Sequence, residues 1–157
     1  MTRIIQISDP HIVPYGQMAY GQVDTAEALS NCVETINRCL PEIGPIDMVF
    51  VSGDLTDFGT VEEYERFRAL MEPLNLAYRV IPGNHDNIEV MRECFADQPW
   101  MPTVGPINWD AHFDDLVVIG LDSSVAEAAH GHLSDETLSF LSTTLEANGG
   151  KPTIVMT

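Results

Sequence analysis

The segment Ile46-Asp-Met-Val-Phe-Val-Ser-Gly-Asp54 is an apolar run that stops on a glycine and an aspartate. Two further runs stop on polar clusters: Arg3–Ser8 leads into Asp9-Pro-His11, and Ala77–Pro82 leads into Gly83-Asn84-His85-Asp86. Short runs rich in Ile and Val, separated by helical patterns, are typical of buried parallel strands. Because open α/β sheets gather ligands at the carboxyl ends of such strands, we expect the three clusters to form one site.

Apolar residues at helical spacing lie between these runs, and turn residues divide the rest of the chain. Thr60 with Glu63 forms a capping box, which marks the start of a helix that ends before Pro73. The other expected helices span Asp24–Leu40, Asn87–Phe95 and Ser134–Ala147, and the further strands span Asn108–Phe113, Leu116–Leu121 and Pro152–Thr157. The sequence has no internal repeat or linker, which favours one α/β domain over residues 1–157.

The composition is that of a globular chain, because 45% of the 157 residues are hydrophobic. No apolar run approaches the roughly 18 residues that a membrane span needs, and the first apolar stretch is too short for a signal peptide. We therefore expect a cytoplasmic protein without a membrane span. The cysteines, Cys32, Cys39 and Cys94, lack metal-knuckle spacing and are expected to be buried and reduced.

The formal charge is −17, and Lys151 is the single lysine. No basic stripe is available to follow a phosphate backbone, which argues against a long nucleic acid as a partner. Bound divalent cations would offset part of the negative charge, and the rest is expected on solvated helix faces. A homo-oligomer is one possible assembly.

The three polar clusters have the chemistry of a metal site. Asp9 and His11 are two residues apart in extended or loop backbone, so both side chains can reach one ion. The Asp54 carboxylate can bridge two ions, and Asn84 offers a neutral carbonyl oxygen to the second. His85 beside them is suited to act as an acid or as a donor to a phosphoryl oxygen. Each cluster alone also fits a surface turn or a helix cap, but their coincidence at three strand ends favours metal.

The order Asp9-x-His11, Gly53-Asp54 and Gly83-Asn84-His85-Asp86 resembles the signature of the calcineurin-like metallophosphoesterases. Within this superfamily the chain is similar to the class III cyclic nucleotide phosphodiesterase and glycerophosphodiesterase group. That similarity lies in Ile7–His11, Tyr20–Asp24, Val51–Asp57, Leu121–Ser124 and, less specifically, His132–Glu136. The resemblance implies an α/β/β/α metallophosphoesterase sandwich.

The resemblance also implies a dinuclear centre of two divalent metal ions (Fe, Mn, Zn or Co), with a metal-bound hydroxide that attacks phosphorus. Asp9 and His11 would bind the first ion, and Asp54 would bridge. Asn84 would bind the second ion, and His85 would be the catalytic residue that assists at the phosphoryl group. The implied substrate is a small phosphodiester, either a 3′,5′-cyclic nucleotide or a glycerophosphodiester.

The sequence departs from the family pattern in two ways. Pro10 stands where the family usually carries Thr or another non-proline residue, and it fixes the local backbone without removing a ligand. The family pattern also continues, after the strand that matches Pro152–Met156, with a His-bearing cluster and a Gly-His-x-His cluster. We therefore expect residues 1–157 to be the amino-terminal part of a single domain whose carboxyl-terminal half is missing. The alternative is a catalytically incomplete fragment or a non-enzymatic scaffold with a partial metal site.

Other polar residues are expected to have lesser roles. Three carboxylates are expected to support the site by capping or hydrogen bonding rather than to bind metal: Asp57, Asp86 and Asp122. Three histidines are expected at surface or structural positions: His112, His130 and His132.

Overall fold

The computed structural model describes the whole chain, Met1–Thr157. In chain order the elements are β1 (Ile4–Ser8), α1 (Thr25–Ile43), β2 (Met48–Ser52), α2 (Val61–Met71), β3 (Tyr78–Ile81), α3 (Ile88–Cys94), β4 (Trp109–His112), β5 (Val117–Gly120), α4 (Asp135–Ala147) and β6 (Thr153–Met156). Every helix and strand expected from the periodicity is present, with ends that differ by a few residues.

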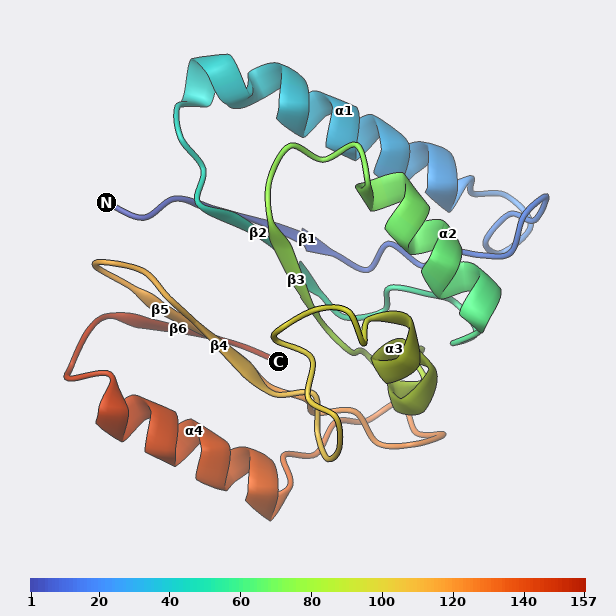
Figure 1. Cartoon of the computed structure of the whole chain (residues 1–157). Helices are drawn as coiled ribbons and strands as arrows, with labels where there is room; N and C mark the ends of the chain where they lie inside the picture. Colours follow the sequence, from blue (N-terminus) through green and yellow to red (C-terminus); the bar gives the residue numbers. More distant parts are fainter.

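The strands form two three-stranded sheets that face each other (Figure 1). The first sheet has the order β1-β2-β3 and is entirely parallel. In the second sheet β4 pairs antiparallel with β5, and β5 pairs parallel with β6. Helices α1 and α2 lie on the outer side of the first sheet, and α4 lies on the outer side of the second. The chain therefore has the expected α/β/β/α layers.

Side chains at the amino ends of the helices satisfy backbone donors there. Asp24 accepts a hydrogen bond from the Glu27 N–H at 2.9 Å and caps α1. Thr60 and Glu63 form the predicted capping box of α2, in which the Thr60 N–H donates to Glu63 Oε2 at 2.9 Å. Ser134 accepts from the Thr137 N–H at 3.1 Å and starts α4. These local signals explain why the helix starts follow from the sequence.

The main core lies between the two sheets. Phe50 of β2 stacks on Trp109 of β4, with ring centroids 5.4 Å apart and planes 13° apart. The Trp109 indole N–H donates to the Val80 carbonyl at 2.6 Å, which satisfies a backbone acceptor of β3. A buried tryptophan needs such a partner for its N–H. The Trp109 side chain thus fixes the second sheet against the first.

Strand β5 is buried on both faces. Val118 belongs to the core between the sheets, whereas Val117 and Ile119 form a smaller cluster with Phe140 and Leu141 of α4. This alternation follows from the two-residue period of a strand. It explains why the β5 run contains no polar residue.

Two of the four edge strands, β1 and β6, are more exposed than expected for buried strands. Gln6 and Ser8 of β1 are exposed, and so are Ile154 and Val155 of β6. Helix α1 ends at Ile43, three residues beyond the expected end at Leu40, and it includes Pro41.

The three cysteines are free, as expected, but they are only partly buried. No helix combines the length and the apolar character that crossing a bilayer requires.

The contact between Gly120 and Trp109 gives a stability prediction. A Cβ atom at position 120 would overlap the indole ring of Trp109 and lie 2.7 Å from Ile81 Cγ2. Gly120→Ala should therefore destabilise the fold by about 1–3 kcal/mol, measured by urea unfolding. In a Trp109→Phe background the same substitution should cost less, because the smaller ring leaves room. An equal cost in both backgrounds would show that the overlap is not the cause.

Candidate metal centre

The loops after β1 and β2 continue the parallel pairing of their strands. The His11 N–H donates to the Asp54 carbonyl at 2.9 Å, and the Ile12 N–H donates to the Leu55 carbonyl at 3.0 Å. Ile12 and Thr56 form a further parallel bridge. Because the two loops remain joined, they carry Asp9, His11 and Asp54 to the same place beyond the sheet edge.

The backbone at these residues is strained. Asp9, His11 and Asp54 have φ angles of 53°, 43° and 46°, in the left-handed region that residues other than Gly seldom adopt, although Asp and His adopt it more often than most. Such residues cost about 1–3 kcal/mol each and gather at functional sites. Gly83 is needed for a different reason, since a Cβ atom there would overlap the Asp54 carboxylate. The local geometry therefore brings side chains together at a cost to backbone conformation.

Three of the expected ligands form a compact group. One potential ligand atom from each of Asp9, His11 and Asp54 lies within 4.8 Å of the other two. His11 Nε2 is 3.5 Å from Asp54 Oδ2, and Asp54 Oδ1 accepts a hydrogen bond from the His85 N–H at 3.0 Å. The Asp54 residue is only 9% exposed. Its carboxylate thus lies between His11 from one loop and the His85 backbone from another.

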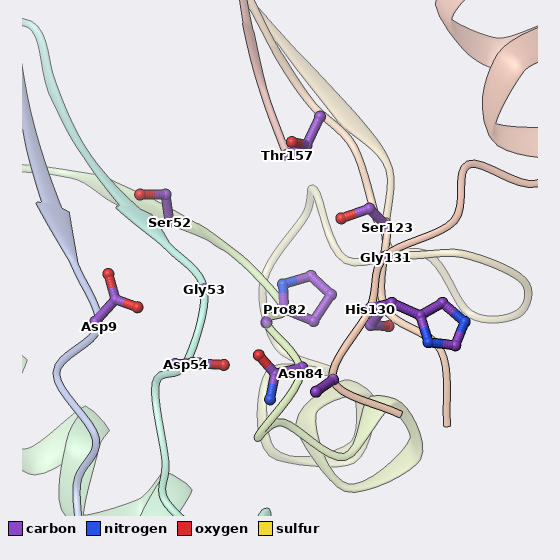
Figure 2. Close-up of a pocket in the computed structure, with 13 residues that line it drawn as sticks. Asp9, Ser52, Gly53, Asp54, Pro82, Asn84, Ser123, His130, Gly131 and Thr157 are labelled. Atoms are coloured by element: carbon purple, nitrogen blue, oxygen red, sulfur yellow. The ribbon is translucent and has the colours of Figure 1, made fainter. Parts of the chain in front are cut away.

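A pocket opens beside this group (Figure 2). It has a volume of about 200 Å³, and Asp9, Asp54 and Asn84 line it from the ends of β1, β2 and β3. The opposite wall comes from the second sheet and the loop after it, including Ser123 and His130. The expected ligand Asn84 therefore shares a pocket with the two carboxylates, whereas His11 does not line it.

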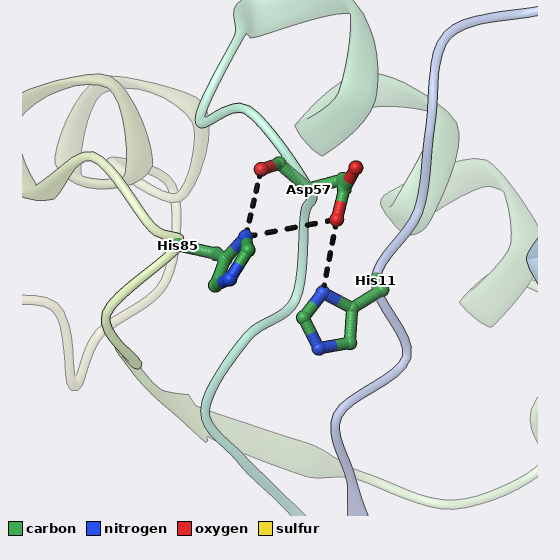
Figure 3. Close-up of side chains that lie close together, drawn as sticks. All are labelled: His11, Asp57 and His85. Carbon is green, nitrogen blue, oxygen red and sulfur yellow. Dashed lines mark hydrogen bonds and ion pairs between the residues drawn. The ribbon is translucent and has the colours of Figure 1, made fainter. Parts of the chain in front are cut away.

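Asp57 lies between the two histidines of the site (Figure 3). Its Oδ1 is 3.2 Å from His11 Nδ1 and 3.6 Å from His85 Nδ1, and its carbonyl accepts a hydrogen bond from His85 Nδ1 at 2.9 Å. The two rings meet edge to face, with centroids 4.7 Å apart. With Nδ1 engaged on both rings, Nε2 is the free nitrogen, and on His11 it faces Asp54. The structure places Asp57 in the supporting position expected from the sequence.

His11, Asp57 and His85 also have the spacing of a metal site, since their potential ligand atoms lie within 4.8 Å of one another. A carbonyl oxygen can only accept a hydrogen bond, so His85 Nδ1 must carry a proton to bond Asp57 and cannot bind metal through that nitrogen. We therefore infer that Asp57 orients the rings of His11 and His85 and that these three residues do not form a separate metal site. The hydrogen bond to the Asp57 carbonyl also raises the pKa of His85 above its ordinary value.

Asp86 and Asp122 both accept several hydrogen bonds. Asp86 accepts from the N–H groups of Gly83, Leu55 and Thr56 and from the hydroxyls of Thr56 and Tyr64. Burial raises the pKa of the Asp86 carboxyl, and these hydrogen bonds oppose that shift. Asp122 accepts from the Ile107 N–H at 3.0 Å and from Ser124. Neither carboxylate has the spacing of the ligand group, which agrees with their expected supporting role.

One histidine lies closer to the site than the sequence suggests. His130 is exposed, as expected, but it also lines the pocket with Asp9 and Asp54. No spacing pattern signals this, because the loop from Ser123 to His132 reaches the pocket from the other sheet. His132 lines an adjoining cavity, and His112 pairs with Asp110 at 2.6 Å away from the pocket.

The family model of the calcineurin-like phosphoesterases matches residues 2–157. The chain belongs to the calcineurin-like phosphoesterase family. Proteins of this family generally use divalent metals, and the carboxylates and imidazole of Asp9, Asp54 and His11 fit such ions.

Curated relatives have related names. A probable glycerophosphodiester phosphodiesterase of Arcobacter nitrofigilis is 38% identical over 138 residues, which cover 88% of this chain and 50% of the relative. A 3′,5′-cyclic adenosine monophosphate phosphodiesterase of Pseudomonas aeruginosa is 31% identical over 147 residues, which cover 93% of this chain and 50% of the relative. The chain thus spans about half the length of these relatives.

A solved structure supports the fold. A purple acid phosphatase from yellow lupin seeds has a TM-score of 0.56 and 17% sequence identity, and the match covers 93% of this chain and 28% of that chain. At this identity the likeness shows the α/β/β/α arrangement alone.

The position of Asp57 predicts how metal binding depends on it. Asp57→Ala should weaken Mn²⁺ binding by about 10–100-fold in a calorimetric titration, because His11 loses the acceptor that orients its ring. Asp57→Asn keeps an oxygen acceptor and should recover most of the affinity. Asp97→Ala is a matched control, since Asp97 is an exposed carboxylate paired with Arg68. If Asp57→Asn binds as weakly as Asp57→Ala, the role of Asp57 is not to orient the ring.

Proposed function

We propose that the protein containing this chain is a metal-dependent phosphodiesterase that hydrolyses a small phosphodiester. One observation carries the proposal: the ends of β1 and β2 bring potential ligand atoms of Asp9, His11 and Asp54 within 4.8 Å of one another, and the end of β3 brings Asn84 and His85 beside them. The family match and the names of the relatives support the same chemistry.

In this proposal Asp9 and His11 would hold the first ion, Asp54 would be shared between the ions, and Asn84 would contribute to the second. The ligand types suit Fe, Mn, Zn or Co. Bound there, two divalent ions would supply Lewis acidity and an activated water for in-line attack on phosphorus. The residues of the chain hold the ligand atoms in place: Asp54 through the His85 N–H, and His11 through Asp57.

His85 is proposed as the catalytic residue. Its Nδ1 donates to the Asp57 carbonyl, which leaves Nε2 free for a phosphoryl or leaving-group oxygen. The same hydrogen bond raises the pKa of His85 and favours the protonated ring that a donor requires. His85 also lines the larger cavity next to the pocket, where part of a substrate would lie.

The proposed substrate is a glycerophosphodiester or a 3′,5′-cyclic nucleotide, the two classes named in the relatives. No Lys or Arg lines the pocket of about 200 Å³. A long nucleic acid needs repeated phosphate contacts from such residues, so this pocket favours a small diester.

The proposed role of Asp54 as a shared metal ligand can be tested in the full-length protein. Asp54→Ala should reduce turnover of bis(p-nitrophenyl) phosphate with added Mn²⁺ by orders of magnitude, because both ions lose a shared ligand. Asp97→Ala, the exposed control, should stay within twofold of the parent. Near-normal turnover in Asp54→Ala would contradict the role of Asp54 as a shared metal ligand. Tight metal binding without turnover in the parent protein would favour the scaffold alternative.

For His85→Ala the expected result differs. Metal content should stay near that of the parent, because the backbone N–H that holds Asp54 remains. Turnover should fall by about 10²–10⁴-fold, as expected for loss of an acid or donor. Metal analysis and the same assay measure both quantities, with His112→Ala as the histidine control. Loss of metal in His85→Ala would instead make His85 a ligand.

A further inference from the structure

A separate cavity lies where β3, an edge strand of the first sheet, meets β4, an edge strand of the second. It has a volume of about 360 Å³, which is within the range of small-molecule sites. Residues of β3, β4, α4 and the segment between α3 and β4 line it, and none of them lines the pocket at the candidate metal centre. The cavity is therefore a second concave site on the molecule.

Arg79 of β3 is the cationic group of this cavity. It is in register with Phe50 of β2, whose ring stacks on Trp109 between the sheets. Residues in register on neighbouring strands share a face of the sheet, so the Arg79 side chain is on the face that meets the second sheet. Its guanidinium lies 5.5 Å from the centroid of the Trp109 ring. Burial lowers the pKa of Arg79, which shows that this position is unfavourable for a charge.

Most of the hydrogen-bonding capacity of Arg79 is unused. A guanidinium has five N–H donors, and within the chain one of its nitrogens donates to the Asp110 carbonyl. Arg68 and Arg92 each pair with a carboxylate, whereas Arg79 forms no ion pair. The Asp110 carboxylate instead lies 2.6 Å from His112 Nε2. The fold therefore holds a partly buried positive charge without a negative partner.

The walls around Arg79 are aromatic. Trp100 and Trp109 approach edge to face, with ring centroids 6.4 Å apart, and Phe140 of α4 lines the same cavity. The Trp109 indole N–H donates to the Val80 carbonyl, but the Trp100 indole N–H makes no hydrogen bond within the chain. The cavity thus combines an unpaired guanidinium with flat apolar surfaces.

We propose that this cavity binds a small aromatic carboxylate, with its acid group on Arg79 and its ring against Trp100 and Phe140. A planar guanidinium can donate two parallel hydrogen bonds to a carboxylate. A single negative charge is favoured over a phosphate dianion, because Asp110 lines the same cavity and the formal charge of the chain is −17. This site does not depend on the proposed function.

The first test titrates 2-naphthoate into the full-length protein and follows the indole N–H signals by NMR. Both tryptophans of the 157 residues line the cavity, and Trp100→Phe identifies the signal of Trp100. That signal should shift and saturate at about millimolar naphthoate, the scale for a ligand of this size. The neutral amide, 2-naphthamide, has the same rings and should bind at least about tenfold more weakly, because it lacks the charge. Equal binding of the two compounds would overturn the proposal.

The second test changes Arg79. Arg79→Gln should weaken naphthoate binding by about tenfold or more, the scale of hydrogen bonds to a charged group. Arg79→Lys keeps the charge without the planar fork and should bind with intermediate affinity. Arg38→Gln is the matched control, since Arg38 is exposed on α1, and it should bind like the parent.

Thermal unfolding shows which of these variants are folded. A folded Arg79→Gln variant that binds naphthoate like the parent would overturn the site. If Arg79→Gln does not fold, the comparison of naphthoate with naphthamide in the parent protein decides.

The third test separates the cavity from the candidate metal centre, because a carboxylate can also bind to metal ions. The naphthoate shift at Trp100 should persist in Asp54→Ala, since Asp54 does not line the cavity. Loss of the shift in a folded Asp54→Ala variant would place naphthoate at the metal centre and overturn the proposal. None of these measurements involves phosphodiester turnover, so their failure would leave the proposed function standing.

Discussion

The carboxylate of Asp86 joins the loop after β2 to the loop after β3. It accepts hydrogen bonds from Leu55 and Thr56 in the first loop and from Gly83 in the second. Asp54 and Asn84 come from these two loops, so their separation depends on this contact. Hydrogen bonds to a charged acceptor contribute about 1.5–3 kcal/mol each, the same order as the strain at one left-handed residue. The contact can therefore offset the backbone strain that places Asp54.

The hydrogen bonds then continue from one side chain of the site to the next. Asp54 receives the His85 N–H, the Asp57 carbonyl receives the His85 ring, and the Asp57 carboxylate lies against the His11 ring. Asp54, His11 and His85 are thus each held by a second residue, which limits the rotamers available to them. This order matters because a metal site with poorly fixed ligands loses affinity and geometry together. The continued pairing of the β1 and β2 loops supplies the rigid base for the whole set.

The sequence predicts those features of the fold and of the candidate site that depend on residues close together in the chain. The helix caps at Thr60 and Ser134 and the strand periods are local, and the helices and strands appear where these signals place them. The gathering of Asp9, Asp54 and Asn84 in one pocket follows from parallel topology, which the runs also predict. The exposure of the edge strands does not follow, because it depends on which strands are neighbours. His130 likewise reaches the pocket through the packing of the second sheet, which no spacing in the sequence reveals.

The two sheets contribute different walls of the pocket. The first sheet and its loops carry the expected ligands, whereas the segment after β5 carries Ser123 and His130 and closes the pocket from the opposite side. That segment is held by its own contacts, since the His132 N–H donates to the Ser123 carbonyl at 2.8 Å and Asp122 binds Ser124. A change in this segment can therefore alter the opposite wall of the pocket without disturbing the hydrogen bonds around Asp54. The side chains that face the ligand group across the pocket therefore depend on the packing of the second sheet and not on the loops that carry Asp9 and Asp54.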